Sequence, residues 1–253
     1  MGVRQVFMTV ALALIATTCL VAQTPAKPTP QPTTAPSGST ATGDQGTLTI
    51  EQLYLSQEVE IQLLRTQAFS NTREGKALAL QDIKSGIEAG KYSSDSKEVM
   101  VILDALAGEG VYRTVRTNGE LSNDFPDIRK DSVALLGLIG GKAARDILIK
   151  VLHSDKEPMV QAEAIYALGN AKDASKDNLP YMAEILHNNS ALSTPDQNLA
   201  YAALLAVEKI AVKEKGIADP DIINAVLDVI YGRYQRNVVL KALDVLKKMH
   251  NQA

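Results

Sequence analysis

The three histidines have the most versatile side chains in this chain, because histidine both binds metals and transfers protons near neutral pH. They are His153, His187 and His250. His153 and His187 each follow a leucine at the end of an amphipathic stretch, and neighbouring helices would hold such positions roughly 10 Å apart. The ligands of one zinc ion lie much closer together. We therefore expect solvated helix-end residues, with no metal site and no cofactor.

Known catalytic motifs are missing as well. The sequence contains neither a Gly-x-Ser-x-Gly elbow nor a Walker phosphate loop, and it has no His-Glu dipeptide. Its 29 acidic residues make carboxylate pairs uninformative. We interpret the protein as non-catalytic. The alternative is an enzyme or enzyme subunit acting on an envelope substrate such as peptidoglycan, which a deep cleft of Glu, Asp and His beside residues 111–125 would favour.

Two groups of tyrosine and arginine residues are candidates for binding a protein partner. Tyrosine and arginine dominate interface hot spots, because they combine a large contact area with directional hydrogen bonds. Both types are also common at exposed turns, where the rings pack on the nearest helix. The first group is Tyr112, Arg113 and Arg116, and the second is Tyr231, Arg233, Tyr234 and Arg236.

The first 22 residues have the layout of a secretory signal peptide. Arg4 supplies the positive start, and the apolar run from Val6 to Ile15 is shorter than the roughly 20 residues that span a bilayer. We therefore expect export to the periplasm or cell envelope. Cys19, the only cysteine, lies inside this segment. A lipid anchor on it, which would make the protein a lipid-anchored structural envelope protein, is the less favoured alternative because the preceding residues match a lipoprotein box poorly.

Residues 23–46 are rich in Pro, Thr and Ser, which predicts a disordered linker because such a composition buries too little apolar surface to offset ordering. The formal net charge is −3 and becomes −4 without residues 1–22, from 25 basic against 29 acidic residues. This balance argues against nucleic-acid binding, which favours a strongly basic surface.

The elements that would position any binding residue are revealed by a repeat of 32 residues. Pro126 and Pro158 each open a stretch that closes on Leu-Gly, with Gly137 and Gly169 where a side chain would crowd the turn. Weaker copies follow at 39-residue spacing. Repeats of this size indicate stacked antiparallel helix pairs, so we expect an all-α solenoid. The expected repeat core comprises Ile128, Val133, Leu136, Val160, Ile165, Leu168, Leu199, Leu204, Val207, Val238, Leu243 and Leu246.

The repeated pattern resembles HEAT repeats, in the short bacterial phycobilisome-lyase-type form. The resemblance rests on Ile-Arg-x3-Val-x2-Leu-Gly from Ile128 and on Leu152-x2-Asp155-x2-Pro158-x-Val160. It is good over residues 126–170 and weaker to about residue 250. Arg129 stands where this family usually has an arginine, and the second copy has Gln161 instead. The resemblance implies curved surfaces that dock another macromolecule, and it does not imply the lyase reaction.

The remaining folded part divides into helices and one irregular segment. We expect residues 47–110 to form N-terminal helices, as degenerate repeats or a cap, with Val59, Leu63 and Leu64 along one side of the first. We expect residues 111–125 to form an irregular loop rather than a hairpin, although Asn118-Gly119 is a turn signal. Residues 126–250 form the HEAT-like repeats, with an insertion at 187–196. The sequence thus predicts an exported, non-catalytic scaffold for a protein partner.

Overall fold

The structure is a computed structural model, and it describes residues 50–250, with side chains from Leu55 onward. The predicted signal peptide, Cys19 and the predicted linker lie outside these residues. Residues 48–253 form one compact unit. Among the described residues, no helix has both the length and the apolar character to cross a membrane.

The described residues are mostly helical. The helices are α1 (Ile50–Ala68), α2 (Arg73–Glu88), α3 (Lys97–Ala107), α4 (Pro126–Ile139), α5 (Gly141–Ser154), α6 (Pro158–Asn170), α7 (Leu179–Ser190), α8 (Gln197–Lys213), α9 (Pro220–Tyr231) and α10 (Arg236–His250). A short 3₁₀ helix, η1 (Lys176–Asn178), precedes α7, and two-residue strands β1 (Arg116–Thr117) and β2 (Glu120–Leu121) lie between α3 and α4.

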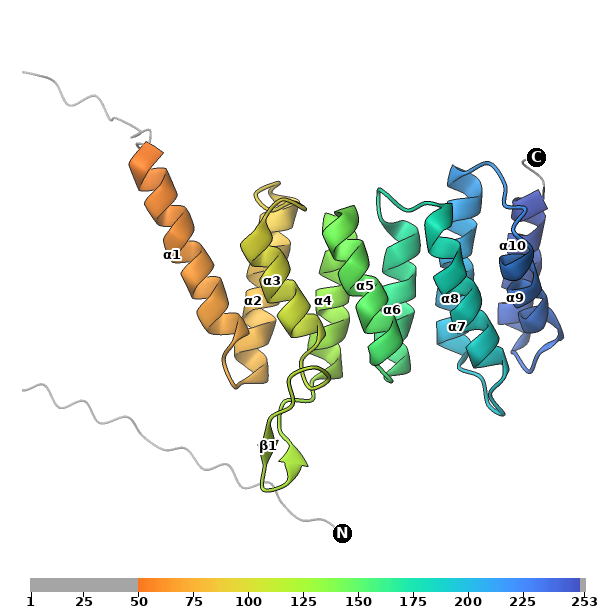
Figure 1. The fold of residues 1–253 in the computed structure, drawn as a ribbon, viewed down its shortest axis with the longest axis horizontal. Helices are drawn as coiled ribbons and strands as arrows, with labels where there is room; N and C mark the ends of the chain where they lie inside the picture. The colour runs from red at the N-terminus through yellow and green to blue at the C-terminus, as the bar shows by residue number, and fades with distance from the viewer. Residues whose placement is uncertain (1–49, 251–253) are drawn as a thin grey trace, which may run out of the picture. The chain divides into compact units, whose positions relative to one another are not determined.

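The helices stack in two layers (Figure 1). In the even-numbered layer, α2 contacts α4, and contacts continue from α4 to α6, α8 and α10. The odd-numbered helices α1, α3, α5, α7 and α9 form the other layer, so that consecutive helices alternate between layers. This arrangement confirms the predicted all-α solenoid of stacked antiparallel helix pairs.

Helix starts follow from local sequence. Pro126, Pro158 and Pro220 occupy the first turn of α4, α6 and α9, where a missing N–H leaves no hydrogen bond unmade. Asp196 and Asp219 cap α8 and α9, because their carboxylates accept hydrogen bonds from backbone N–H groups of the first turn. These signals fix where each repeat begins.

The two repeated glycines allow neighbouring helices of the even-numbered layer to approach closely. A Cβ added at Gly137 would lie 2.7 Å from the Cβ of Ala167, and one added at Gly169 would lie 2.4 Å from the Cα of Ala206. We expected these glycines to prevent crowding within a turn. They instead make room for the next repeat, because both lie inside helices that face α6 and α8.

Ten of the twelve expected core residues are buried, at 6% exposure or less. Leu246 is half-buried and packs against the core. Leu243 is 39% exposed, so its assignment to the core is wrong. In α10 the buried row consists of Val238, Ala242, Val245 and Met249. Leu243 lies on the next face of α10, which no further described helix covers.

Three other expectations need correction. Residues 111–125 contain a hairpin, because Asn118 and Gly119 take positive φ values of 54° and 86°, as a tight β-turn requires. The insertion in the second repeat lies mainly at 171–178, between α6 and α7, whereas α7 continues through Ser190. Val59 and Leu63 point away from the core, at 69% and 55% exposure, and only Leu64 of that group is buried.

Candidate functional site

The segment between α3 and α4 carries the first tyrosine–arginine group. Two members of the group, Tyr112 and Arg113, hold this segment against the neighbouring helices. The Tyr112 hydroxyl lies 2.6 Å from Ser154 Oγ, and Lys150 Nζ lies 4.1 Å from the centre of the Tyr112 ring. Burial raises the pKa of Tyr112. The Arg113 guanidinium lies 5.5 Å from the centre of the Phe69 ring. Tyr112 and Arg113 therefore attach this segment to α1 and α5 rather than project from it.

Arg116 has a different position from the other two members of its group. It lies in β1 and is exposed, and its Nη1 donates a hydrogen bond to the Gly119 carbonyl at 3.0 Å. The hairpin extends beyond the ends of the neighbouring helices (Figure 1). Arg116 is consequently the member of this group that is placed to meet another molecule.

A buried charged network fixes the base of the same segment. The Arg129 side chain is 4% exposed, and its Nε donates to Asp155 Oδ2 at 2.7 Å. Its Nη1 donates to the Glu109 carbonyl at 3.1 Å and to Asp124 Oδ1 at 2.5 Å. Burial alone would lower the pKa of Arg129, but these carboxylates outweigh it and raise the pKa above its usual value. One cation thus joins the end of α3, the start of α4 and the end of α5.

Glu109 continues this network toward α2. Its Oε1 accepts a hydrogen bond from Asn123 Nδ2 at 2.9 Å and lies 3.3 Å from Lys76 Nζ. Lys76, Glu109 and Asn123 are all buried. A buried carboxylate with both an amide and an ammonium partner is satisfied, so this network holds the segment in place and leaves no reactive group unpaired.

The second tyrosine–arginine group lies around the α9–α10 connection. The Tyr234 hydroxyl lies 2.9 Å from Ser190 Oγ and accepts a hydrogen bond from Asn189 Nδ2 at 3.1 Å. Arg233 Nη1 donates to the Ser193 carbonyl at 3.3 Å. Burial is the main reason that the pKa of Tyr234 is raised. Tyr234 and Arg233 therefore fasten this connection to the α7–α8 connection.

The other two members of the second group are directed outward. Tyr231 is 85% exposed and Arg236 is also exposed. The structure therefore does not gather all seven residues into one surface. Arg116, Tyr231 and Arg236 are exposed, with Arg116 bonded to Gly119 of its own hairpin, whereas the other four contact residues of other segments of the chain.

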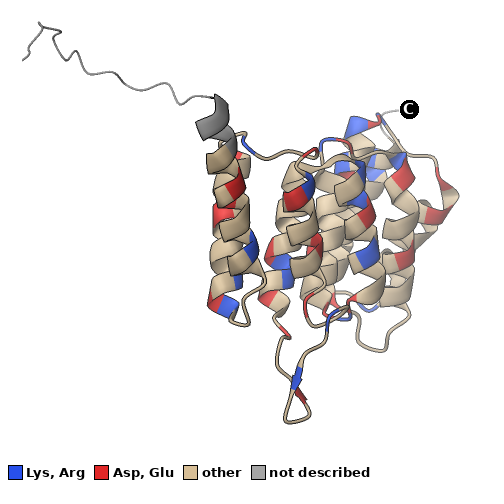
Figure 2. Ribbon diagram, turned by 60° about the vertical axis from the view of Figure 1, so that its left-hand side comes forward, with Lys and Arg blue, Asp and Glu red and all other residues tan. Residues whose placement is uncertain are grey.

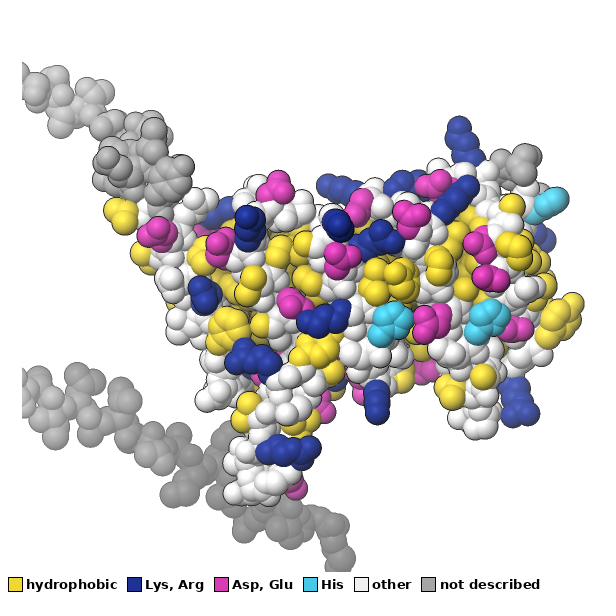
Figure 3. Space-filling model, in the orientation of Figure 1, with side chains coloured by type: hydrophobic (Ala, Val, Ile, Leu, Met, Phe, Trp, Pro, Cys, Tyr) yellow, Lys and Arg dark blue, Asp and Glu magenta, His cyan; other side chains and the backbone are white. Residues whose placement is uncertain are grey.

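The histidines lie at helix ends, as expected, and two of them, His153 and His187, lie beside an acidic side chain of the next odd-numbered helix. His187 Nδ1 is 2.6 Å from Asp228 Oδ2, and His153 Nδ1 is 3.8 Å from Glu184 Oε1. Figure 3 shows histidine and acidic side chains adjoining one another on this face. Within the part of the chain that the structure describes, no three His, Cys, Asp or Glu residues are placed to hold a metal ion. These pairs join α5 to α7 and α7 to α9.

An open groove between α6 and α8 is the feature that the sequence analysis missed. It encloses 540 Å³ on the outer face of the even-numbered layer. Two equivalent strips form it, with i, i+3, i+4, i+7 spacing in each helix. They are Met159, Ala162, Glu163 and Tyr166 of α6, and Asn198, Tyr201, Ala202 and Leu205 of α8. Every member of the second strip lies 39 residues after its counterpart, so the spacing that located the core could also have located this groove.

The groove combines apolar side chains with acidic groups. Met159 and Tyr201 are 47% and 38% exposed. Glu157 and Glu163 line the groove, and burial is the main reason that the pKa of Glu163 is raised. Lys130 also lines it, 3.4 Å from Asp131. Elsewhere, basic and acidic residues are interspersed over the helices (Figure 2).

The family model of HEAT repeats matches residues 115–191. This range contains the hairpin and α4 to α7, and it overlaps the expected resemblance. The fold is a HEAT-like α-solenoid. No curated protein matches the chain. HEAT-like solenoids present extended surfaces built from successive repeats, so the chain has the architecture of a scaffold for protein interaction.

Proposed function

We propose that this HEAT-like solenoid is a non-catalytic scaffold that docks a protein partner in the groove between α6 and α8. The observation that carries the proposal is the pair of equivalent strips, which expose Met159 and Tyr201 on adjacent helices. Methionine and tyrosine are enriched at protein interfaces, where flexible or amphipathic side chains gain contact area at modest entropic cost. An open groove of this kind suits an extended or helical segment rather than a small enclosed substrate.

The chemistry of the groove specifies the partner segment. The apolar floor of Met159, Tyr166 and Leu205 requires apolar side chains, and the carboxylates of Glu157 and Glu163 favour basic ones. A partner cation beside Glu163 would also relieve the cost of burying that carboxylate. We infer a segment that alternates apolar and basic residues, with Arg116, Tyr231 and Arg236 as outlying contacts of a larger partner.

We propose further that the protein acts in the periplasm or at the cell envelope, as a member of the short bacterial phycobilisome-lyase-type group. The support for export is the sequence of residues 1–22, with Arg4 ahead of an apolar run and small residues near Ala22. Mass spectrometry of the mature chain tests this part. An N-terminus at Gln23, Thr24 or Lys27 supports a cleaved soluble form, and a lipid-modified Cys19 supports the anchored form.

Docking is tested by placing a photo-crosslinking amino acid at Tyr201 and, as a control, at Val101 of the other layer. Val101 is apolar and 62% exposed, so a crosslink at this position would indicate non-specific association with exposed apolar side chains. We expect a crosslinked protein from native envelopes at position 201 and not at 101. Met159→Glu should abolish the crosslink, whereas Val101→Glu should preserve it. Equal crosslinking at both positions, or a crosslink that persists in Met159→Glu, would contradict docking in this groove.

A further inference from the structure

Helix α1 turns an apolar row away from the rest of the solenoid. Leu55, Val59 and Leu63 are 62%, 69% and 55% exposed, and their spacing of four residues aligns them along one side. Leu64 and Ala68, on the opposite side, are buried against the array. A surface helix ordinarily keeps polar residues on its outer face. The outer face of α1 therefore has the character of a helix that packs against something on both sides.

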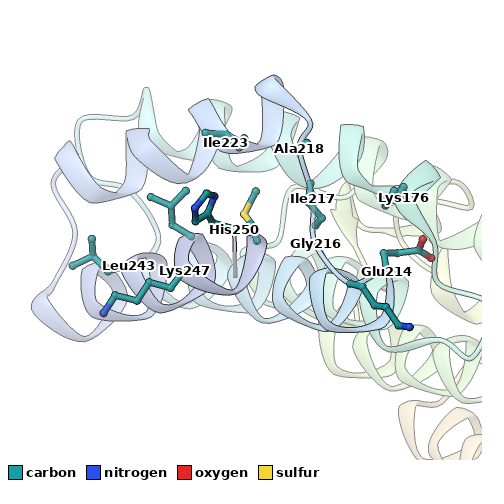
Figure 4. A pocket seen from close by; sticks show the side chains of 12 residues that line it. Lys176, Glu214, Gly216, Ile217, Ala218, Ile223, Leu243, Lys247 and His250 are labelled. Carbon is teal, nitrogen blue, oxygen red and sulfur yellow. The ribbon is translucent and has the colours of Figure 1, made fainter. Parts of the chain in front are cut away.

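The other end of the array has a matching apolar hollow. It encloses 790 Å³ between α9, α10 and the connection at 214–218, with Ile223, Leu243 and Leu246 in its wall (Figure 4). Helices α9 and α10 form the last helix pair that the structure describes (Figure 1). The hollow is therefore the end face of the solenoid.

The repeat register shows what this end face is equivalent to. In α8, Ala200, Leu204 and Val207 are completely buried. The residues 39 positions later in α10 are Val239, Leu243 and Leu246, which are half-buried or exposed. The same row of positions is thus covered by the next helices in α8 and left uncovered in α10. The last described helix pair therefore has the packing surface that an additional helix pair would cover.

The order of the two layers identifies which helix can add to this end. Of the described helices, the first, α1, lies in the odd-numbered layer and the last, α10, lies in the even-numbered layer. An α1 helix placed after α10 would therefore continue the alternation without interruption. A second copy of this chain supplies such a helix, already exposed along its outer side.

Charge also favours this pairing. Lys215 and Lys247 line the hollow, and neither forms an ion pair within the described residues. His250 lies beside them, and Glu214 is the acidic residue of the wall. Glu58 is exposed on α1 next to the apolar row, also without an ion-pair partner in the described part of the chain. In an end-to-end contact, Glu58 of one copy would approach the excess positive charge around the hollow of the next.

We propose that copies of this chain associate end to end, with the outer face of α1 of one copy packed into the α9–α10 hollow of the next. The contact joins two different surfaces, so it is heterologous and generates rings or open chains rather than a closed two-fold dimer. It uses the ends of the solenoid and leaves the α6–α8 groove uncovered, so it stands independently of the proposed docking function.

The test uses residues 48–253, the compact unit that contains all the described core, and two blocked variants. Val59→Glu with Leu63→Glu blocks the α1 face, and Leu243→Glu blocks the hollow. These side chains are exposed, so both variants should keep the far-UV circular dichroism of the unsubstituted unit. In sedimentation velocity, the unsubstituted unit should grow in mass with concentration, and each variant alone should remain a monomer.

Mixing the two blocked variants distinguishes this contact from every other mode of association. Each variant keeps one intact surface, so the mixture should form a dimer with one copy of each and grow no further. Val101→Glu is the matched control and should associate as the unsubstituted unit does. Glu58→Lys or Lys247→Glu alone should weaken association about tenfold. A chain that carries both charge reversals should associate as the unsubstituted unit does, because each contact then again joins opposite charges. A unit that stays monomeric at millimolar concentration, a blocked variant that still self-associates, or a mixture that stays monomeric would overturn the proposal.

Discussion

The joint between α6 and α8 and the joint between α8 and α10 follow one another in the same layer, yet different chemistry closes them. At the first joint, Gly169 packs so closely against Ala206 that a Cβ at position 169 would lie only 2.4 Å from the Ala206 Cα. The position 39 residues later is Glu208, whose carboxylate lies 2.5 Å from Lys241 Nζ and also pairs with Lys248. The comparison teaches that one repeat position can serve as a steric contact in one joint and as an ionic contact in the next.

The α4–α6 joint adds a third solution. It has the close contact of Gly137 with Ala167 and also the buried ion pair of Arg129 with Asp155. The second repeat replaces that arginine with Gln161, whose amide donates to the Asp155 carbonyl at 2.9 Å. Buried charge and tight packing therefore dominate at α4–α6, and a partly exposed ion pair dominates at α8–α10. The joints should differ accordingly in their response to substitution, salt and pH.

The largest effect is expected for Arg129→Met. This change leaves the carboxylate of Asp155, which is 2% exposed, buried without its cation. Removing one partner of a buried ion pair typically costs about 3–5 kcal/mol in the free energy of unfolding. Urea denaturation measures this cost, and Arg116→Met on the exposed hairpin is the control. A loss below about 1 kcal/mol would show that the α4–α6 joint does not depend on buried charge.

A somewhat smaller loss is expected for Gly169→Leu. The added side chain meets helix backbone, which cannot rotate away, so we expect a loss of about 3 kcal/mol by urea denaturation. Leu138→Met, at a half-exposed position of α4, is the control for a change of side chain without a clash. A Gly169→Leu variant as stable as the unsubstituted protein would mean that α6 and α8 separate readily.

Compensating substitutions sharpen this comparison of the two glycine joints. At Gly137, an added Cβ conflicts mainly with the Cβ of Ala167, so Ala167→Gly should recover most of the stability lost in Gly137→Ala. At Gly169, the conflict includes the Cα of Ala206, so Ala206→Gly should recover little of the loss in Gly169→Ala. Double-mutant cycles measure both coupling free energies. Equal recovery at the two joints would show that their contacts do not differ in this way.

A loss of about 1 kcal/mol is expected for Glu208→Gln, because a partly exposed ion pair contributes modestly. The difference between this variant and the unsubstituted protein should shrink in 1 M salt, since salt screens exposed charges. Unfolding by urea at low and high salt measures it. Gly169→Leu, which changes a steric contact, is the internal control and should lose the same free energy at both salt concentrations.

The smallest effect is a pH dependence confined to α10. Burial alone would raise the pKa of Glu208, but the hydrogen bonds from Lys241 and Lys248 outweigh it and lower the pKa. A carboxylate with a lowered pKa contributes its stability above the ordinary value of about 4.3 and loses it as the pH falls through the folded-state pKa. The protection of α10 amides against hydrogen exchange should therefore fall below about pH 4, before that of α6 amides. Glu208→Gln should remove this difference.

The positions of the helices could be read from the sequence because their signals are local. Prolines in first turns, capping Asp residues and apolar spacing act within one helix, and α4, α6 and α8 begin where these signals place them. The hairpin was the exception, since Asn118-Gly119 was visible but the two-residue ladder is also held by contacts beyond the turn, from Tyr112 to Ser154 and from Asn123 to Val115 and Arg113. The candidate groove has the same 39-residue spacing, but its residues are partly exposed, and the apolar periodicity of a buried core does not mark such positions.

The tyrosine and arginine groups show the opposite case. Residue type alone gave Tyr234 and Tyr231 the same expected role, and the structure separates them because only Tyr234 reaches Ser190 and Asn189 across the repeat. Such pairings join residues more than 40 positions apart, so no local pattern encodes them.

The sequence alone determined that this chain builds stacked helix pairs, because each amphipathic helix must bury one face and the 32- and 39-residue spacings show which face that is. Only the tertiary structure decided which members of that face are covered. Leu204 and Leu243 occupy the same repeat position, and the first is buried while the second is 39% exposed. The physical reason is that burial depends on the neighbours of a residue, and among the described helices α8 has neighbours on both sides whereas α10 has them on one.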